Sequence, residues 1–291
     1  MSSHVSLNFH KLMERYLAYR NDWVDSTRYE ARNAIPKFFA WLGDRSITPE
    51  NVQEYYDFIG KHINGGTADK IAKHTSQFLR WLNTDGWLKI DPSEGVKKPK
   101  ATVAGVMTAY TRDEYIKLRD GITKPYNEVI IVLWSTGMSI VDAIELKWFE
   151  IDLNEMMIFK KRKKMISRGG SLQKIPIFQN TDLDRLIQSR MKRIRNRKPE
   201  DRFFPELETR DMKQHGNIIK AACISLGVTW RGTQGFRRAV CSALGNAKHL
   251  NILQGMAMSG HKDIDVFRDK YVTVDHELLR QNIAEALKNH F

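Results

Sequence analysis

The sequence predicts a protein that is mainly α-helical with one small β-sheet, arranged as two domains. Its 291 residues are more than a single domain usually holds. Apolar residues recur at helical spacing along most of the chain, and hydrophobic residues make up 42% of it, enough to form a folded core. Two short β-type runs, at 156–159 and 175–178, flank a polar basic segment and predict a β-hairpin.

Apolar stripes predict four helices within the first hundred residues. Ser26 is expected to cap the second helix, and Gly43 to end it. The sequence Thr-Pro-Glu at 48–50 predicts the start of the third, because a hydroxyl cap, a first-turn proline and an acid all favour a helix N-terminus. Two glycines break the chain before Thr67, which is expected to open the fourth. We therefore predict a compact four-helix domain over residues 1–96.

A basic linker is expected after the four helices. Proline, glycine and lysine cluster there, with Lys97, Lys98 and Lys100 close together. We place the linker at residues 97–108 and the second domain at residues 109–291.

Helices also dominate the predicted second domain. Thr111 is expected to cap its first helix, and the apolar segment Val129–Trp134 reads as a buried helix because Pro125 and Gly137 bracket it. Further helices are expected at about 183–194, 212–226 and 233–244, and an amphipathic helix with Leu279, Ile283, Ala286 and Leu287 is expected to close the chain.

The charge of the chain indicates a polyanionic partner. Lys and Arg number 47 against 34 Asp and Glu, which gives a net charge of +13 and a pI of about 9.6. Such an excess attracts nucleic acid, although a protein that is merely basic and soluble would have the same composition.

Several other classes of function find no support in the sequence. The longest apolar run is too short to span a bilayer, and the first residues lack the pattern of a secretory signal, so a cytoplasmic location with the DNA is expected. Cys223 and Cys241 are isolated from each other and predict neither a disulfide framework nor a zinc site. No phosphate-binding glycine loop or metal-ligand motif occurs, so we expect neither a metal nor a cofactor.

Three local patterns suit chemistry on a phosphate. The first is a run of adjacent cations at 160–164, whose mutual repulsion a phosphate would relieve, although such a run is also typical of a solvated loop. The second is Gln-Gly-Phe-Arg-Arg at 234–238, at the start of a helix, where anions are favoured. The third is Ser-Gly-His at 259–261, with Tyr271 ten residues after the histidine.

Taken in order, these patterns resemble the tyrosine recombinases of the phage-integrase type. Residues 91–99 resemble the family's Asn-Pro-x-x-x-Val-x-x-Pro exit from its core-binding domain, and residues 136–146 resemble its Thr-Gly-x-Arg-x-x-Glu-x-x-x-Leu box. Residues 234–237 resemble the His-x-x-Arg box, and Ser-Gly-His with Tyr271 resembles the Leu-Gly-His motif and the terminal tyrosine. The resemblance covers nearly the whole chain and implies a core-binding domain and a catalytic domain that clamp double-stranded DNA.

The resemblance also implies a mechanism. Tyr271 would attack a DNA phosphate and form a 3′-phosphotyrosyl link, while Arg237 would bind the non-bridging oxygens. A hairpin lysine would protonate the departing 5′-oxygen. We favour Lys163, with Lys161 next, because the family lysine follows the last apolar strand position by about five residues. His261 would bind the phosphate or orient its neighbours.

Contacts with DNA and with other copies of the chain are implied as well. The final helix would dock on a neighbouring protomer in a dimer or tetramer assembled on DNA. The residues expected to contact DNA are Lys97, Lys98, Lys100, Lys160, Lys161, Arg162, Lys164, Arg168 and Arg238.

Two departures from the family pattern leave the activity open. Gln234 stands in place of the box-two histidine, and an amide still donates a hydrogen bond. Ser139 stands in place of the first catalytic arginine, and removing such a donor typically costs about 2.7–4 kcal/mol of transition-state stabilisation. Arg162 or Arg168 could replace it. The alternatives are an atypical recombinase, a catalytically inactive DNA-binding protein on the same scaffold, or a basic helical protein unrelated to recombination.

Overall fold

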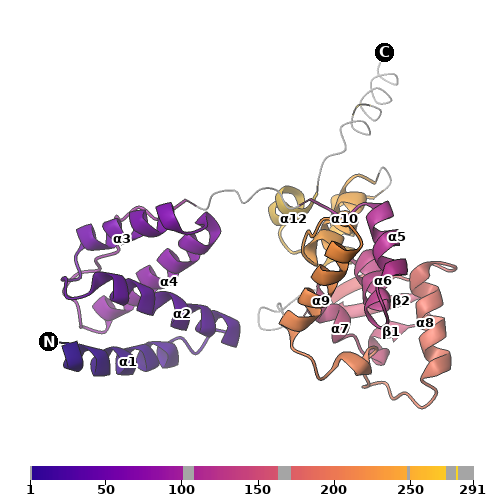
Figure 1. The fold of residues 1–291 in the computed structure, drawn as a ribbon, viewed down its shortest axis with the longest axis horizontal. Coiled ribbons are helices and arrows are strands. Elements are labelled where there is room, and N and C mark those ends of the chain that lie inside the picture. The colour runs from indigo at the N-terminus through magenta and orange to yellow at the C-terminus, as the bar shows by residue number, and fades with distance from the viewer. Residues whose placement is uncertain (1, 101–107, 163–171, 248–249, 273–279, 281–291) are drawn as a thin grey trace. The chain divides into compact units, whose positions relative to one another are not determined.

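The chain divides into two compact units, Met1–Val106 and Met107–Phe291 (Figure 1). Each unit has a hydrophobic core of its own. The computed structural model describes residues 2–100, 108–162, 172–247, 250–272 and 280, without the side chains of 2–8, 270 and 271. Within these described residues, no helix is both long and apolar enough to cross a membrane.

Unit 1 is built from four helices, as the apolar stripes predict. Its core is rich in aromatic rings, with Tyr16, Phe38, Tyr55 and Phe78 fully buried among aliphatic side chains. The side chain of Thr48 accepts a hydrogen bond from the Asn51 amide at 3.3 Å, which confirms the predicted cap. The helices are α1 (Ser2–Tyr19), α2 (Asp25–Leu42), α3 (Pro49–His62) and α4 (Gly65–Thr84).

Two predicted helix starts in this unit are each wrong by two residues. Helix α2 begins at Asp25 rather than after a Ser26 cap, and the capping position is held by Val24. Helix α4 begins at Gly65 rather than at Thr67, because the Asn64 side chain accepts a hydrogen bond from the Gly66 amide at 3.1 Å. Asparagine is as good an N-cap as a hydroxyl residue, so it sets the start earlier.

Both ends of the predicted linker are held by the unit next to them. The Lys97 amide donates to Gln53 Oε1 at 2.9 Å, and Gln53 Nε2 donates back to the Lys97 carbonyl. Arg231 Nε donates to Thr108 Oγ1 at 2.7 Å. Most of the segment between these ends, residues 101–107, lies outside the described residues.

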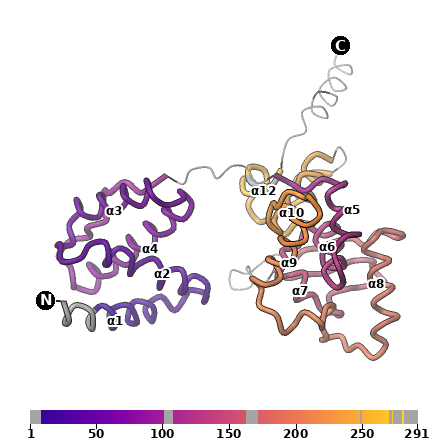
Figure 2. The backbone as a smooth tube through the Cα atoms, in the orientation of Figure 1, coloured from indigo at the N-terminus to yellow at the C-terminus, as the bar shows by residue number. Residues whose placement is uncertain are grey.

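Unit 2 combines helices with one small sheet, in agreement with the predicted fold class. Thr111 caps α5 in a reciprocal capping box with Glu114, as its sequence position predicts. Helix α6, the predicted buried helix, contacts α5, α7, α8 and α10 (Figure 2). The helices are α5 (Arg112–Gly121), α6 (Tyr126–Thr136), α7 (Ile140–Ile144), α8 (Asp182–Arg193), α9 (Met212–Ser225), α10 (Gln234–Gly245), α11 (Ile252–Ser259) and α12 (Ile264–Tyr271).

The sheet is antiparallel and contains the predicted hairpin. Its strands are β1 (Ile151–Asp152), β2 (Met157–Lys161) and β3 (Leu172–Pro176), in the order β1-β2-β3. Ile158 pairs with Ile175 and Lys160 with Gln173. Both isoleucines are fully buried, so this register turns the apolar side of the hairpin toward the core.

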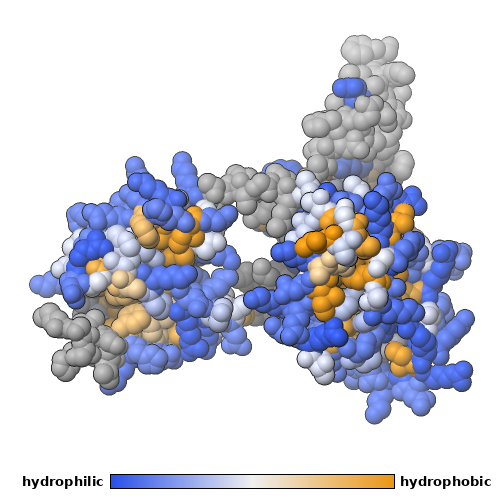
Figure 3. Space-filling view, viewed as in Figure 1, coloured by the Kyte–Doolittle hydropathy of each residue, from blue (hydrophilic) through white to orange (hydrophobic). Residues whose placement is uncertain are grey.

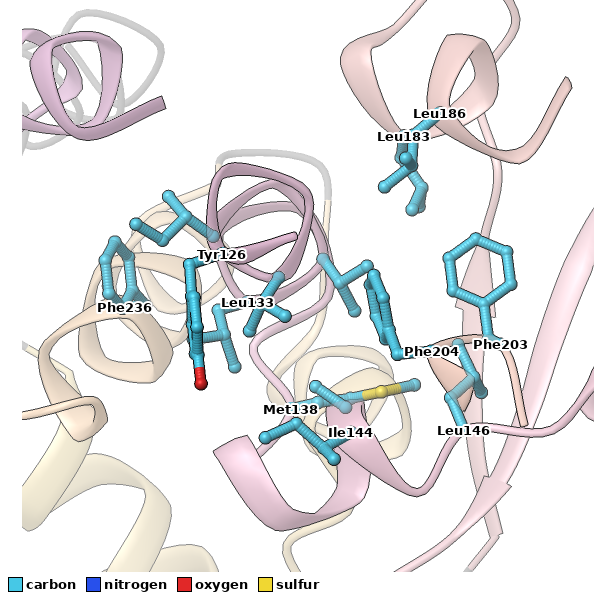
Figure 4. Packing of buried hydrophobic residues seen from close by; sticks show 14 of the residues in the cluster. Tyr126, Leu133, Met138, Ile144, Leu146, Leu183, Leu186, Phe203, Phe204 and Phe236 are labelled. Atoms are coloured by element: carbon cyan, nitrogen blue, oxygen red, sulfur yellow. The ribbon is translucent and has the colours of Figure 1, made fainter. Parts of the chain in front are cut away.

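The core of unit 2 joins α6 to the elements that carry the predicted site. Figure 4 shows Tyr126 and Leu133 of α6 near Met138 and Ile144 of the following segment and Phe236 of α10. All five side chains are buried. Because Phe236 precedes Arg237, packing of this ring fixes where the arginine enters the interior.

Candidate active site

Arg237 lies at the centre of a cluster that brings together the ends of two helices. Its side chain is fully buried, at 0% exposure. Nη1 donates to the Gly137 carbonyl at 2.8 Å, and Nη2 donates to the Ser259 carbonyl at 2.5 Å. Gly137 ends α6 in the left-handed conformation, at φ 64°, and Ser259 is the last residue of α11. Carbonyls at helix C-termini lack intrahelical partners, so they suit a buried guanidinium.

His261 lies against this guanidinium and is uncharged at neutral pH. Its Nε2 lies 3.2 Å from Arg237 Nη2, and its Nδ1 lies 2.8 Å from Ser259 Oγ. Burial, together with the charges of Arg237 and Arg162, lowers the pKa of His261 to about 3. The Ser259 hydroxyl donates its one proton to the Met256 carbonyl at 3.3 Å. Arg237 Nη2 also lies 3.3 Å from Nδ1, so the guanidinium faces both ring nitrogens.

The hairpin holds the turn that carries His261. Arg162, directly after β2, donates from Nη1 to the Gly260 carbonyl at 3.3 Å, and Gln173 of β3 donates to the Met258 carbonyl at 3.1 Å. Gly260 has φ 69°, and a Cβ there would lie 2.6 Å from Gln173 Cγ and 3.0 Å from Arg162 Cδ. Gln173 was not among the predicted site residues, because nothing in the hairpin sequence indicates a partner 85 positions away.

Ser139, which the resemblance places at the position of the family's first arginine, caps a helix. Its Oγ donates to Asp142 Oδ2 at 2.7 Å and accepts from the Asp142 amide at 3.2 Å, which opens α7. Ser139 follows the Arg237 partner Gly137 by two residues, so it borders the cluster. The site thus has a neutral helix cap at the position that the resemblance assigns to a cation.

Helix α12 packs beside the cluster and ends at Tyr271. Phe267 is fully buried with Cys241 of α10 and Met256 of α11, and its ring centroid lies 5.3 Å from that of His261. Asp263 caps the helix by accepting from the amides of Asp265 and Val266. The side chain of Tyr271 is not among those that the structure describes, so the expected approach of its hydroxyl to Arg237 stays a prediction.

The remaining predicted catalytic residues have separate outcomes. Gln234 begins α10, and its Oε1 is buried with no hydrogen-bond partner within the described part of the chain. Lys163 lies outside the described residues. Of the residues predicted from the sequence, the structure thus brings together Arg237, His261 and Arg162, and Ser139 lies two residues after the Arg237 partner Gly137.

The prediction that Lys160 contacts DNA is wrong. This lysine is only 6% exposed, and its Nζ donates to Glu150 Oε2 at 2.8 Å and to the Glu145 carbonyl at 3.0 Å. The alternation of the strand turns it inward, toward a carboxylate that offsets its charge. Lys97, Lys98, Lys100 and Lys161 are exposed, and Arg238 is half-buried. Lys164 and Arg168 lie outside the described residues.

Neither cysteine forms a disulfide. Cys223 and Cys241 are both free and buried, and burial raises the pKa of the Cys241 thiol to about 11. Among the described residues, no group of three or more His, Cys, Asp or Glu side chains is placed to hold a metal ion.

Comparison with solved structures finds similarity over almost the whole chain. A lambda integrase dimer bound to a COC′ core site has a TM-score of 0.70 at 16% identity, over 92% of this chain and 99% of that one. The Tn1549 transposon integrase in complex with a circular intermediate DNA has a TM-score of 0.73 at 14% identity, over 95% and 98%. XerA recombinase has a TM-score of 0.51 at 16% identity, over 95% and 97%.

Sequence comparison alone does not find these relations. No family description matches the sequence, and no curated protein matches it. The chain has the tyrosine recombinase fold, which confirms the predicted fold class and the resemblance at the level of the fold.

Proposed function

We propose that the protein is a DNA strand-exchange enzyme that cleaves and rejoins DNA through a phosphotyrosyl intermediate at Tyr271. The observation that carries this proposal is the convergence of Arg237, His261 and Arg162 on the turn between α11 and α12, the helix that ends at Tyr271. Two cations and a neutral imidazole at the base of a tyrosine-bearing helix suit an attack on a phosphodiester.

The chemistry conserves one phosphoester bond throughout. The Tyr271 hydroxyl loses its proton to water as its oxygen attacks phosphorus and forms the phosphotyrosyl bond, while the bond from phosphorus to the 5′-oxygen breaks. That oxygen leaves with a proton from a general acid, for which Lys163 is our candidate. Attack by a 5′-hydroxyl of a partner strand reverses these steps and joins the new strands. No external energy source is needed, because the phosphotyrosyl bond retains the free energy of the broken phosphodiester bond.

The described contacts support particular roles for two residues. Carbonyls at 2.8 and 2.5 Å hold the Arg237 guanidinium in place before any substrate binds, which is the preorganisation that transition-state charge requires. His261 acts as a positioning residue for Arg237, because both of its ring nitrogens lie within 3.3 Å of Arg237 Nη2 and Ser259 Oγ holds Nδ1 at 2.8 Å.

A second candidate function is DNA binding without cleavage. Ser139 favours it, because the residue at the position of the family's first arginine is engaged as a helix cap. The loss of one preorganised donor lowers catalytic rates by about 10²–10³-fold. An inactive relative would keep the scaffold and the basic surface.

Self-association on DNA is also part of the proposal. Two of the similar solved structures are described as a lambda integrase dimer bound to a core site and a lambda integrase tetramer bound to a Holliday junction. In unit 2, a mainly apolar pocket of about 930 Å³ is lined by residues of α10 and α11, together with Trp134 and Phe178. Apolar side chains gather on the face of the unit drawn in Figure 3. We assign this pocket to the C-terminal segment of a neighbouring copy, residues 273–291, which lies almost wholly outside the described residues.

The test requires a DNA site, which selection can supply. Duplexes that the full chain binds are enriched from a random library, and the protected sequence is mapped. The site is then synthesised with a nick beside each candidate phosphate, so that cleavage releases a short strand and traps the covalent complex. Wild-type protein and Tyr271→Phe are compared on a denaturing gel.

The two candidate functions give different gels. A DNA-linked band for the wild type that is absent for Tyr271→Phe supports the enzyme. Tight, salt-sensitive binding with no linked band from either protein supports the binding protein. If neither protein binds DNA, both candidate functions are wrong.

A further inference from the structure

We propose that Arg162 binds the same DNA phosphate as Arg237 and supplies the positive charge that the site lacks at Ser139. This inference rests on the proposed function only in requiring that a DNA phosphate occupies the cluster. It assigns a phosphate-binding role to a residue outside the motif positions of the family pattern.

The anchoring of the two guanidinium groups carries the argument. Arg237 Nη2 donates to the carbonyl of Ser259, and Arg162 Nη1 donates to the carbonyl of Gly260, the next residue. Neighbouring Cα atoms lie about 3.8 Å apart, so both groups are attached to one short stretch of backbone. Two guanidinium groups bound to the carbonyls of adjacent residues suit a single phosphate, whose oxygens arginine binds through paired N–H groups.

The backbone at Gly260 leaves room for the Arg162 side chain. Gly260 has φ 69°, a conformation that side chains disfavour, and a Cβ would lie 3.0 Å from Arg162 Cδ. Any larger residue would push the Arg162 side chain away from the turn. The glycine of the Ser-Gly-His motif therefore gives the hairpin arginine access to the cluster, besides ending α11.

The electrostatics of the cluster agree with this position. The pKa of His261 is lowered first by burial and then by the positive charges of Arg237 and Arg162, so both arginines act on the same imidazole. The two positive charges repel each other, and an anion bound to both offsets that repulsion. Ser139 contributes no charge here, because its hydroxyl is bonded to Asp142.

A purely structural role must be separated from phosphate binding. Arg162 also holds the C-terminal end of α11, where a cation and a donor are both favourable. The variant Arg162→Gln keeps an N–H donor for the Gly260 carbonyl but removes the charge. Arg162→Lys keeps the charge without the planar fork. The exposed Lys192 of α8 lies outside the proposed site, so Lys192→Gln is a charge-matched control.

The experiment measures DNA affinity as a function of salt, and cleavage of the nicked site, for these variants in the full chain. Each phosphate contact contributes about one to the slope of log affinity against log salt. We expect Arg162→Gln to lower that slope by about one and to lower the cleavage rate by about 10²–10³-fold. Arg162→Lys should retain the slope, and Lys192→Gln should match the wild type. Adding Ser139→Arg to Arg162→Gln should restore cleavage to within about tenfold of the wild type.

Each outcome supports or overturns the inference. It is overturned if Arg162→Gln keeps the wild-type slope and rate, or if it loses cleavage only in proportion to a loss of thermal stability. If the wild type binds DNA but never cleaves, the enzyme proposal fails, and the slope of Arg162→Gln against Lys192→Gln still decides the role of Arg162. If the wild type does not bind duplex DNA at all, the inference fails together with its premise.

Discussion

At the scale of single residues, Ser139 acts as a helix cap. Its hydroxyl satisfies the Asp142 amide and its carboxylate at the same time. We expect Ser139→Ala to lower the free energy of unfolding by about 1 kcal/mol, within the range typical of lost N-caps. Urea denaturation at neutral pH measures this change. DNA affinity should stay at the wild-type value, and a weaker affinity would contradict the assignment of Ser139 to a structural role.

His261 predicts a defined pH dependence of stability. The pKa of His261 is lowered from 6.5 to about 3 in the folded state. Between these two pH values the unfolded chain therefore binds a proton at His261, whereas the folded chain does not. Its contribution to stability is therefore fully present above pH 6.5 and is lost as the pH falls from 6.5 toward 3.

The variant His261→Gln removes this titration. We expect the wild-type advantage in free energy of unfolding over His261→Gln to shrink between about pH 7.5 and pH 5, as measured by urea denaturation at each pH. Parallel curves for the two proteins would show that the imidazole is not buried against the arginines.

The sequence predicts a residue's role where the residue belongs to a motif. It does not do so where the role depends on a contact with a residue far away in the sequence. Arg237 and His261 were both predicted, and the structure brings them together. The run at 160–164 gives no sign that Lys160 faces Glu150 while Lys161 faces solvent, since that depends on strand register. The contact of Arg162 with Gly260 spans 98 positions and depends on the packing of β3 against α11.

At the scale of elements, the turn after α11 depends on the absence of a side chain at Gly260. We expect Gly260→Ala to destabilise the protein by more than the roughly 1–2 kcal/mol that a left-handed alanine costs, because its Cβ would also overlap Gln173 and Arg162. Gly227 is a matched control, since it has φ 65° and a Cβ added there would have no atom within 4 Å. Thermal unfolding of both variants separates the two effects. Equal losses of thermal stability in the two variants would mean that Gln173 and Arg162 of the hairpin do not pack tightly against Gly260.

The docking of α12 is a second property of an element. Phe267 is a buried contact of this helix with α10 and α11, and it lies four residues before Tyr271. We expect Phe267→Ala to accelerate hydrogen exchange across 264–271 and to lower the yield of DNA-linked protein by about 10²-fold, since a small displacement of a reacting group has that effect.

Phe267→Leu is the control for this prediction, because it keeps most of the apolar volume. DNA affinity should be unchanged in both variants, as α12 would position the nucleophile rather than bind the duplex. A loss of affinity equal to the loss of adduct would instead indicate that the whole unit unfolds.

Elements were predictable from the sequence where local chemistry sets them. Thr48 and Thr111 cap α3 and α5 because a hydroxyl in the right position needs no tertiary partner. The short elements α7, β1 and α11 were not predicted. They are too short for an apolar repeat, and packing against α6, β2 and β3 holds them in place.

At the scale of the whole molecule, positive charge is concentrated in unit 2. Residues 1–106 contain 15 Lys and Arg against 12 Asp and Glu, whereas residues 107–291 contain 32 against 22, so the net charges are +3 and +10. Most of the salt dependence of DNA binding should therefore belong to the unit that carries the Arg237 cluster. The net charge of the whole chain does not reveal this unequal distribution, because the charge of each unit can be counted only once the boundary between the units is known.

The division into two units predicts how the chain is cut by a protease. Each unit has its own core, and the ends of the predicted linker are held at Lys97 by Gln53 and at Thr108 by Arg231. Trypsin cuts poorly before proline, so the bond after Lys98 resists it, whereas Lys100 is exposed and followed by alanine. We expect the first cut after Lys100, identified by mass spectrometry of the fragments, because proteases favour polar connections between folded units.

The fragments provide the second half of this prediction. Residues 1–100 and 101–291 should each remain folded and unfold cooperatively, since each unit has a hydrophobic core built from its own side chains. A first cut within 28–37 or 160–164, both of which contain basic residues, would contradict the linker assignment. Fragments that precipitate or lose their helical signal on separation would mean that the two cores are stable only together.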